Sequence, residues 1–341
     1  MKKIRLALIF GGLSPEHDVS LVSAGSVYEN LNPQKYDLFC LYIDRRGMWH
    51  RVSSPKHLPP PEEAGGFPLP LIDGKGFWER VDVAFPVLHG CNGEDGTVQG
   101  LFEMAKLPYV GCGVLGSAVG MEKTFTKLIV QRAGIPVVPS LDFFRERIQQ
   151  ARESVVSEIC AHLPFPLFVK PSTGGSSVGI TKVKGAESLA EALTKAAAVS
   201  PRVLVEKAID AQEIECAVLG DRMKAEASPL GEVVPFKEFY DYEDKYLLGK
   251  TTFHIPAPVD AALSQRLKEQ AVLAFHALDL YGLARVDFLL DRTTGEAFLN
   301  EVNTLPGFTS ISMYPRLWQE AGIPFPQLLD RLVELGLKRY G

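Results

Sequence analysis

The chain has 341 residues, more than one hydrophobic core usually serves, and this length predicts two or three domains. Hydrophobic residues make up 46% and charged residues 23%, which excludes the disordered, fibrous and disulfide-stapled classes. The net charge of -5 argues against a broad nucleic-acid-binding face, because such faces carry an excess of Lys and Arg.

The five cysteines are odd in number and lack CxxC spacing, which argues against both a disulfide framework and a zinc site. No apolar stretch reaches about 18 residues, and the short apolar run near Met1 is not followed by a signal-peptide cleavage region. These features predict a cytoplasmic protein with free thiols and with neither nucleic-acid nor membrane partners.

The first 120 residues have the pattern of an open parallel sheet. An apolar run at 4–10 ends at two glycines and is followed by apolar residues at helical spacing, which predicts a strand, a turn and a helix. Apolar runs at 36–43 and 81–88 predict the next two strands. Strands and helices in this alternation are typical of a parallel α/β sheet.

The rest of the chain predicts two further groups of elements. A helix at 122–133 precedes strands at 167–170 and 179–183, which flank a Gly/Ser loop, and a helix at 186–198 and a strand at 203–206 complete a compact α+β unit. Beyond it we expect strands at 213–219, 284–290 and 297–302, a helix at 261–278 and a C-terminal helix.

The first motif is GGLSPEHDVS, from Gly11 to Ser20. Its glycines allow a ligand close to the backbone, and the helix after it offers free N–H groups. The GxGxxG spacing is absent, which argues against a dinucleotide oxidoreductase. The carboxylate of Glu16 could hold an ammonium group; alternatively, it is an N-terminal acid that interacts with the helix dipole.

The second motif, HGCNGEDG at 89–96, directly follows the strand predicted at 81–88. Ligands bind outside the carboxyl ends of parallel strands, so we expect this turn to lie beside the first one in a shared crevice. His89 is a candidate ligand contact, and the alternative is a structural histidine whose hydrogen bonds are satisfied within the protein.

The third motif, FVKPSTGGSSVG at 168–179, places Lys170 at a strand end, before small hydroxyls and glycines. This composition suits a polyphosphate, because the lysine supplies charge and the loop supplies backbone N–H donors. No Walker A sequence is present in the chain. An ordinary Ser/Gly hairpin turn is the alternative.

The fourth motif combines ARVDFLLD at 284–291 with FLNEVNTLPGFTSIS at 298–312. Arg285 and Asp287 are two residues apart on one predicted strand, as are Glu301 and Asn303 on the next, so each pair shares a strand face. Carboxylate and amide oxygens suit Mg²⁺. A solvated sheet face is the alternative, but it leaves the segment from Asn303 to Gly307 unexplained.

These four motifs, in this order, resemble the ATP-grasp superfamily and, within it, the D-alanine:D-alanine ligase family. VEKAIDAQE at 205–213 and EFYDYEDKY at 238–246 extend the resemblance over nearly the whole chain. It implies an α/β (α+β) fold with an N-terminal substrate-binding domain at 1–122, a central domain at 123–212 and a C-terminal metal-binding domain at 213–341. It also implies a homodimer, with ATP bound between the central and C-terminal sheets.

The resemblance implies roles for individual residues. The ATP contacts would be Lys123, Lys170, Ser177, Glu206, Lys207, Ile209, Glu213, Phe239 and Lys245. The ligands of two Mg²⁺ or Mn²⁺ ions would be Asp287, Glu301 and Asn303. The substrate subsites would be lined by Glu16, His89, Arg285, Gly307, Ser312 and Met313. The catalytic residues would be Glu16, Ser176, Tyr246, Arg285 and Gly307.

The implied reaction joins two D-alanine molecules for peptidoglycan precursor synthesis: ATP converts the first carboxylate to an acyl phosphate, and the second amine displaces phosphate. Arg285 and the Gly307 N–H would stabilise the charge that develops on oxygen. A D-alanine:D-serine or D-alanine:D-lactate ligase is the alternative, and Tyr246 favours the dipeptide product. A nucleotide-binding regulator without turnover is the alternative from another class.

Overall fold

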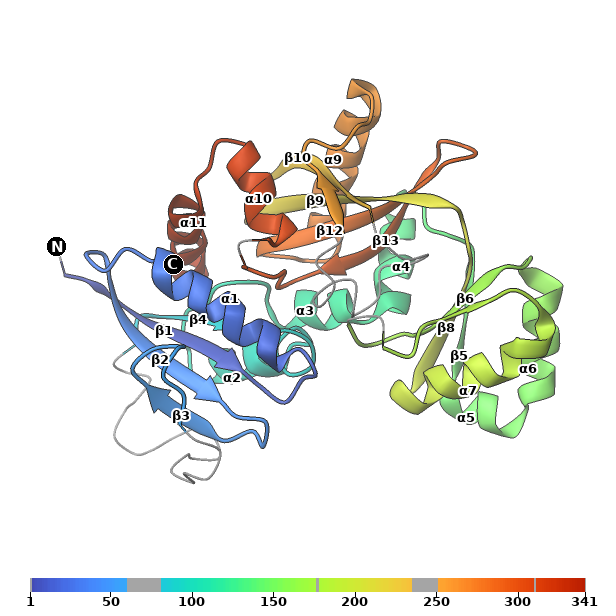
Figure 1. The fold of residues 1–341 in the computed structure, drawn as a ribbon, viewed down its shortest axis with the longest axis horizontal. Helices are drawn as coiled ribbons and strands as arrows, with labels where there is room; N and C mark the ends of the chain where they lie inside the picture. The colour runs from blue at the N-terminus through green and yellow to red at the C-terminus, as the bar shows by residue number, and fades with distance from the viewer. Residues whose placement is uncertain (1, 60–80, 176–177, 235–250, 310, 341) are drawn as a thin grey trace.

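The computed structural model describes residues 2–59, 81–175, 178–234, 251–309 and 311–340. The described part of the molecule contains three sheets, each flanked by helices, as Figure 1 shows. The predicted mixed α/β architecture with several sheets is confirmed. Five residues with predicted roles lie outside the described residues, so their roles stay predictions: Ser176, Ser177, Phe239, Lys245 and Tyr246.

The N-terminal sheet has the strand order β3-β2-β1-β4. β1 (Ile4–Gly11) pairs in parallel with β2 (Tyr36–Ile43) and with β4 (Val83–Val87), as the three apolar runs predicted. The sequence pattern did not predict β3 (Trp49–Val52), which pairs antiparallel with β2 and makes the sheet mixed rather than wholly parallel. The helices of this region are α1 (His17–Asn30), α2 (Thr97–Met104) and α3 (Val114–Met121).

The central sheet is antiparallel, with the order β5-β8-β6-β7. Its strands and helices enclose a core of their own that includes Leu167, Leu193 and Val205. The elements between 140 and 162 were not predicted from the sequence. The elements are β5 (Ser140–Phe144), α5 (Arg145–Gln150), α6 (Arg152–His162), β6 (Leu167–Pro171), β7 (Thr181–Val183), a 3₁₀ turn (Ala186–Ser188), α7 (Leu189–Val199) and β8 (Arg202–Lys207).

The C-terminal sheet is also antiparallel, with the order β11-β10-β9-β12-β13. Both of its faces are buried: Ile214 and Val218 of β9 belong to one core, whereas Ala217 and Leu219 belong to another. This division follows from the alternation of side chains along a strand. The strands are β9 (Ala211–Gly220), β10 (Ala225–Val234), β11 (Thr252–His254), β12 (Gly282–Asp291) and β13 (Ala297–Asn303).

Four helices connect these layers. α4 (Lys123–Arg132) and α9 (Ala261–Ala277) contribute Val130 and Phe275 to the core on one face of the C-terminal sheet. α10 (Met313–Glu320) packs on the other face, and α11 (Phe325–Lys338) contacts both α1 and β4. In the described part of the chain, no helix combines the length and apolar character needed to span a membrane.

The hydrophobic cores cross the predicted domain limits. One core joins Leu8 and Phe85 of the N-terminal sheet to Leu329 of α11, and Phe308, which follows β13, meets Phe85 with ring centroids 6.0 Å apart. α4 packs on β13 although it belongs to the predicted central domain. The limits at 122 and 212 therefore stay a prediction. This packing fixes the chain after β13 against the carboxyl end of β4.

Candidate active site

Glu16 lies between two glycine-containing segments, at Gly90 and Gly175, that are far apart in the sequence. A Cβ atom added at Gly90 would lie 2.7 Å from Glu16 Oε2, and one added at Gly175 would lie 3.0 Å from the same oxygen. Glu16 is the residue before α1, and its side chain makes no capping hydrogen bond to the helix. The predicted proximity of the first two turns is confirmed, and the Gly/Ser loop joins them.

Lys123, at the start of α4, connects the Gly/Ser loop to β13. Its Nζ donates to the carbonyl of Gly174 at 2.9 Å and lies 3.4 Å from Glu301 Oε2. One ammonium group therefore brings the loop that bears the glycines within reach of the strand that bears the predicted metal ligands. The Lys123 side chain is itself 11% exposed, whereas Gly174 at the other end of the hydrogen bond is exposed.

Behind Lys123 lies a buried ion triad. The carboxylate of Glu206 on β8 is 2.6 Å from Lys127 Nζ and 2.5 Å from Lys170 Nζ. Lys127 was not among the residues predicted from the sequence to belong to the site. Its position four residues after Lys123, on the same face of α4, is the signal that could have found it.

The charges of the triad settle its protonation. Burial alone raises the pKa of Glu206, but the two ammonium groups outweigh burial and lower the pKa to about 2. Burial also lowers the pKa of Lys170, and its carboxylate neighbours raise it above the usual value. For Lys127 burial wins and the pKa falls. Glu206 is therefore a carboxylate at neutral pH, and it holds Lys170 in place.

The other predicted ATP contacts lie near this triad in the chain. Lys207 ends β8 with an exposed side chain, and Ile209 follows it, partly buried. Glu213 is partly buried on β9, where it pairs in register with Leu289. Lys170 also approaches Asn300 Oδ1 at 3.5 Å. The triad and these residues line the region where the central and C-terminal sheets meet.

Arg285 is held by two carboxylates on the C-terminal sheet. Its Nε donates to Asp287 Oδ1 at 2.7 Å and lies 3.0 Å from Glu215 Oε2, and its Nη2 donates to Asp287 Oδ2 at 2.7 Å. Burial alone lowers the pKa of Arg285, but the two carboxylates hold it well above its usual range. The guanidinium is therefore a permanent, fixed cation.

The predicted metal ligands gather on β12 and β13. Asp287 and Glu301 are register partners, and Asn303 Nδ2 donates to Asp287 Oδ2 at 2.9 Å. A β-bulge after Asp287 leaves Asn300 as an extra residue, and such bulges re-aim side chains next to functional sites. Among the described residues, no three His, Cys, Asp or Glu form a metal-holding group. Two carboxylates and an amide nevertheless form a hard oxygen donor set of the kind that Mg²⁺ binds together with phosphates.

The segment after β13 carries Gly307 and Ser312. A Cβ atom added at Gly307 would lie 2.8 Å from Ser312 Oγ, and the N–H of Thr309 donates to the same oxygen at 3.0 Å. Met313, predicted to line a subsite, instead packs its side chain in the core against Gly231. Only the backbone of its helical turn is left to meet a ligand.

Comparison with known proteins decides the family. Residues 5–112 match the family model described as D-ala D-ala ligase N-terminus, and residues 129–334 match the one described as D-ala D-ala ligase C-terminus. The chain belongs to the D-alanine:D-alanine ligase family. The predicted family, the ATP-grasp fold class and the assignment as an ATP-dependent ligase are confirmed.

Relatives in this family match over the full length. The D-alanine--D-alanine ligase of Ruminiclostridium cellulolyticum is 47% identical over 100% of this chain and 97% of its own, and that of Solibacter usitatus is 42% identical over 99% and 97%. The solved structure of the VanG D-Ala:D-Ser ligase from Enterococcus faecalis has a TM-score of 0.86 at 37% identity, covering 98% of this chain and 100% of that one. The D-alanine-D-alanine ligase from Coxiella burnetii has a TM-score of 0.83 at 32% identity, covering 99% and 95%.

His89 is a buried residue in this member of the family. Its Nδ1 lies 3.0 Å from the carbonyl of Leu305 and its Nε2 lies 3.0 Å from Ser23 Oγ, so both ring nitrogens face protein groups. Burial lowers the pKa of His89, but Glu94, 3.7 Å from Nδ1, outweighs burial and raises it. This geometry favours the structural alternative over direct contact with substrate. Ser23, which was not predicted from the sequence, is fully buried.

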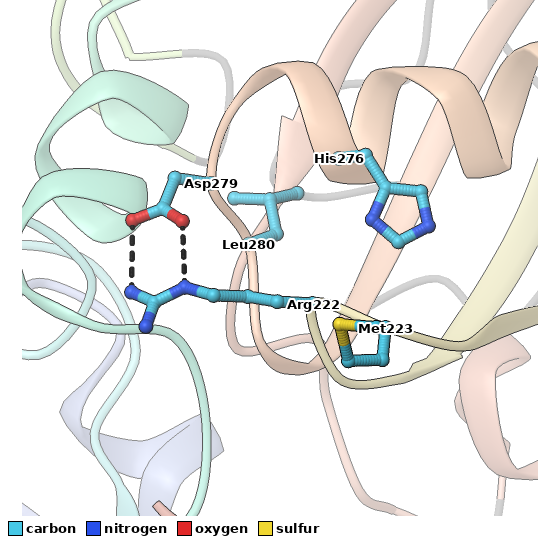
Figure 2. A pocket seen from close by; sticks show the side chains of 5 residues that line it. All are labelled: Arg222, Met223, His276, Asp279 and Leu280. Atoms are coloured by element: carbon cyan, nitrogen blue, oxygen red, sulfur yellow. Dashed lines mark hydrogen bonds and ion pairs between the residues drawn. The ribbon is translucent and has the colours of Figure 1, made fainter.

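A surface hollow elsewhere in this ligase contains none of the predicted site residues. Figure 2 shows its lining, in which Arg222 forms two bonds to Asp279, at 2.9 and 3.2 Å. Arg222 is 68% exposed, and such surface ion pairs stabilise a protein little. The hollow lies at the end of α9 and is lined by Arg222, Met223, His276, Asp279 and Leu280.

Proposed function

We propose that this chain joins two D-alanine molecules to D-alanyl-D-alanine, converting ATP to ADP and phosphate, for peptidoglycan precursor synthesis. Family membership over the full chain supports the reaction class. One observation carries the proposal: Lys123 reaches both Gly174 of the Gly/Ser loop and Glu301 of β13. Cationic groups for a polyphosphate and oxygen ligands for its metal thus lie side by side.

ATP binds in this proposal between the central and C-terminal sheets, with its phosphates toward Lys123 and Lys170. The supporting geometry is the ion triad, which holds Lys170 by Glu206 and leaves an ammonium on each side of the carboxylate. Lys207, Ile209 and the Glu206 backbone would read the adenine edge, and Glu213 the ribose. Phosphoryl transfer needs positioning and charge neutralisation, which fixed lysines supply.

Asp287, Glu301 and Asn303 would hold two Mg²⁺ or Mn²⁺ ions, which neutralise phosphate charge when bound. The donor set fits, since two carboxylates face each other across β12 and β13 with an amide beside them. Arg285 and Asn303 already orient Asp287 by hydrogen bonds, so its oxygens are fixed before any ligand arrives. Such support of a ligating carboxylate is common in metal sites.

Glu16 would hold the ammonium group of the first D-alanine. Its carboxylate lies against Gly90 and Gly175, at the meeting point of the N-terminal sheet and the Gly/Ser loop. The substrate carboxylate then attacks the γ-phosphate, the bond to the ADP oxygen breaks, and an acyl phosphate forms. Ser176 and Tyr246 are the other catalytic residues that we propose for this step.

The amine of the second D-alanine then attacks the acyl carbon, the bond to the phosphate oxygen breaks, and the amine loses a proton. Arg285 and the Gly307 N–H would stabilise the negative charge on the carbonyl oxygen. Ser312 and the backbone at Met313, at the start of α10, would receive the second carboxylate, because helix N-termini favour anions.

A D-alanine:D-serine ligase is the second candidate, because the solved VanG D-Ala:D-Ser ligase has a TM-score of 0.86 with this chain. We further propose a homodimer in the cytoplasm and the domain limits 1–122, 123–212 and 213–341. Light scattering, at the protein concentrations used in the activity assay, tests whether the chain is a dimer. Limited proteolysis tests the proposed domain limits.

The test of the function is ADP formation by the purified chain with Mg²⁺, with and without D-alanine, followed by mass analysis of the product. We expect D-alanine-dependent ADP and a dipeptide, with D-serine and D-lactate as poorer acceptors. ATP binding without D-alanine-dependent ADP formation would favour the nucleotide-binding regulator. A mixed product with D-serine preferred over a second D-alanine would favour the second candidate.

A further inference from the structure

The segment that carries Gly307 is buried except at the glycine. Leu305 and Phe308 on either side are at most 3% exposed, whereas Gly307 is partly exposed. Pro306 fixes one backbone angle directly before the glycine. Phe308 packs against Phe85 and fastens the segment to the N-terminal sheet. The segment therefore presents one backbone unit to the site from a packed support.

Hydrogen bonds hold this segment at two points, one on each side of Gly307. His89 Nδ1 donates to the carbonyl of Leu305 at 3.0 Å, and the N–H of Phe308 donates to Ser23 Oγ at 3.3 Å. Ser23 Oγ and His89 Nε2 meet at 3.0 Å and close the chain of contacts. The Ser23–His89 clamp, as we name these two residues, thus ties both ends of the Gly307 peptide to the N-terminal region.

The polarity of the clamp follows from its partners. A carbonyl oxygen only accepts, so the bond to Leu305 requires a proton on His89 Nδ1 in both the neutral and the charged ring. A backbone N–H only donates, so Ser23 Oγ accepts from Phe308 in both cases. Both side chains are buried, Ser23 completely and His89 to 95%, and neither His89 nitrogen is left for a substrate.

We infer that Ser23 and His89 are positioning residues that fix the Leu305–Phe308 segment so that the Gly307 N–H meets the developing oxyanion. This inference rests on the proposed function. Charge stabilisation in a transition state depends on donors that are already oriented when the charge appears. The clamp supplies that orientation from outside the C-terminal sheet, because α1 carries Ser23 and the turn after β4 carries His89.

The kinetic signature separates positioning from substrate binding. A donor that acts only on the transition state changes kcat and kcat/KM together, whereas a ground-state contact changes KM. For Ser23→Ala we expect kcat to fall about 10-fold, below the 10² to 10³ typical of deleting an oxyanion donor. The KM values for D-alanine and ATP should change by less than about twofold.

The experiment compares Ser23→Ala with Ser117→Ala, the same change at an equally buried serine on α3. The probe is a dipeptide analogue with a tetrahedral phosphinate in place of the amide carbon. We expect Ser23→Ala to weaken its binding by the same factor as kcat, with ADP binding and the Ser117→Ala enzyme unchanged. Thermal unfolding of both variants measures any purely structural loss.

Histidine variants provide a second test. His89→Asn retains an amide donor near the Nδ1 position and should keep more activity than His89→Ala. In the Ser23→Ala, His89→Ala double variant, we expect kcat to fall no further than in the worse single variant, because the two groups act through one segment.

Wild-type kcat and phosphinate binding in Ser23→Ala would overturn the inference while leaving the proposed function intact. A loss confined to the KM for D-alanine would also overturn it, since it would show that the clamp touches the substrate. A wild-type chain without D-alanine-dependent ADP formation would instead overturn the proposed function, and this inference with it.

Discussion

The two sides of the candidate site are held in different ways. On the side proposed to bind the nucleotide, Glu206 fixes Lys127 and Lys170 by buried ion pairs. On the side proposed to face the reacting carbonyl, the Ser23–His89 clamp holds the Gly307 segment by hydrogen bonds to backbone groups. The first side therefore presents the ammonium groups of two flexible lysine side chains that ion pairs hold in place. The second side presents the backbone N–H of Gly307.

This difference suits the two tasks. ATP brings several negative charges, and ammonium groups neutralise them over a range of positions. The acyl carbon develops charge at one point, so its donor must be placed within a few tenths of an ångström, and a backbone N–H in a packed segment gives that accuracy. Arg285 belongs to both sides, since it is a cation held rigidly by Asp287 and Glu215.

Of the changes that test this comparison, removal of the metal is expected to have the largest effect on ADP formation. If the nucleotide side depends on metal as well as lysine charge, chelation with EDTA should abolish ADP formation, and Mg²⁺ or Mn²⁺ should restore it. Thermal unfolding with ATP should show the same dependence, because ligand binding stabilises the folded state. Full activity in excess EDTA would contradict the assignment of Asp287, Glu301 and Asn303.

Replacing Arg285 with Met tests the group shared by both sides. We expect kcat to fall by about 10² to 10³, the size typical of losing one preorganised donor. Asp287 and Glu215 would lose their common cation, so stability should also decrease. Arg222→Met, which breaks an exposed pair on the surface, is the matched control and should leave steady-state phosphate release unchanged.

Glu206→Gln tests the charged side alone. Removing the shared carboxylate leaves two buried ammonium groups without their partner, and breaking a buried pair typically costs about 3 to 5 kcal/mol of unfolding free energy. Urea unfolding at neutral pH measures the change. An unchanged midpoint would show that Lys127 and Lys170 do not need this carboxylate.

The same carboxylate predicts a pH dependence. The folded pKa of Glu206 is about 2, below the ordinary value of 4.5, so its contribution is complete above about pH 4.5. This stabilising contribution of Glu206 is lost as the pH falls from about 4.5 toward 2. Wild-type unfolding free energy should therefore decline more steeply with acid than that of Glu206→Gln. Parallel acid titrations of the two proteins would refute the pair as the cause.

The smallest expected effect is that of Glu16→Gln. A hydrogen bond to a charged group is worth about 1.5 to 3 kcal/mol, so the KM for D-alanine should rise roughly 10-fold or more. Asp18→Asn, on the same helix with an exposed side chain, is the control. An unchanged KM in Glu16→Gln would move the ammonium subsite elsewhere.

The sequence predicted the parts of the site that local pattern determines. Alternation along a strand predicted that Arg285 and Asp287 share one strand face and that Glu301 and Asn303 share another. In the sheet, Asp287 and Glu301 are register partners. The glycine turns after β1 and β4 meet because parallel strands share a carboxyl edge. These inferences need only residue spacing.

The remainder depends on tertiary packing. β3 is four residues long and its antiparallel pairing with β2 has no strong local signal. Ser23 and His89 are 66 residues apart, and nothing in either neighbourhood announces their contact. Met313 was predicted to line a subsite, and nothing in its neighbourhood in the sequence indicates that its side chain packs against Gly231. Lys127 was detectable by helical spacing, but its ion pair with Glu206 was not.

The most direct test of the account is the position of the metal in a crystal of the chain grown with Mn²⁺ and a non-hydrolysable ATP analogue. Anomalous scattering locates manganese without reference to the protein. The account predicts manganese bound by oxygens of Asp287, Glu301 and Asn303 and by the nucleotide phosphates, with Lys123 and Lys170 on those phosphates. Manganese bound away from β12 and β13, or phosphates away from the two lysines, would contradict it.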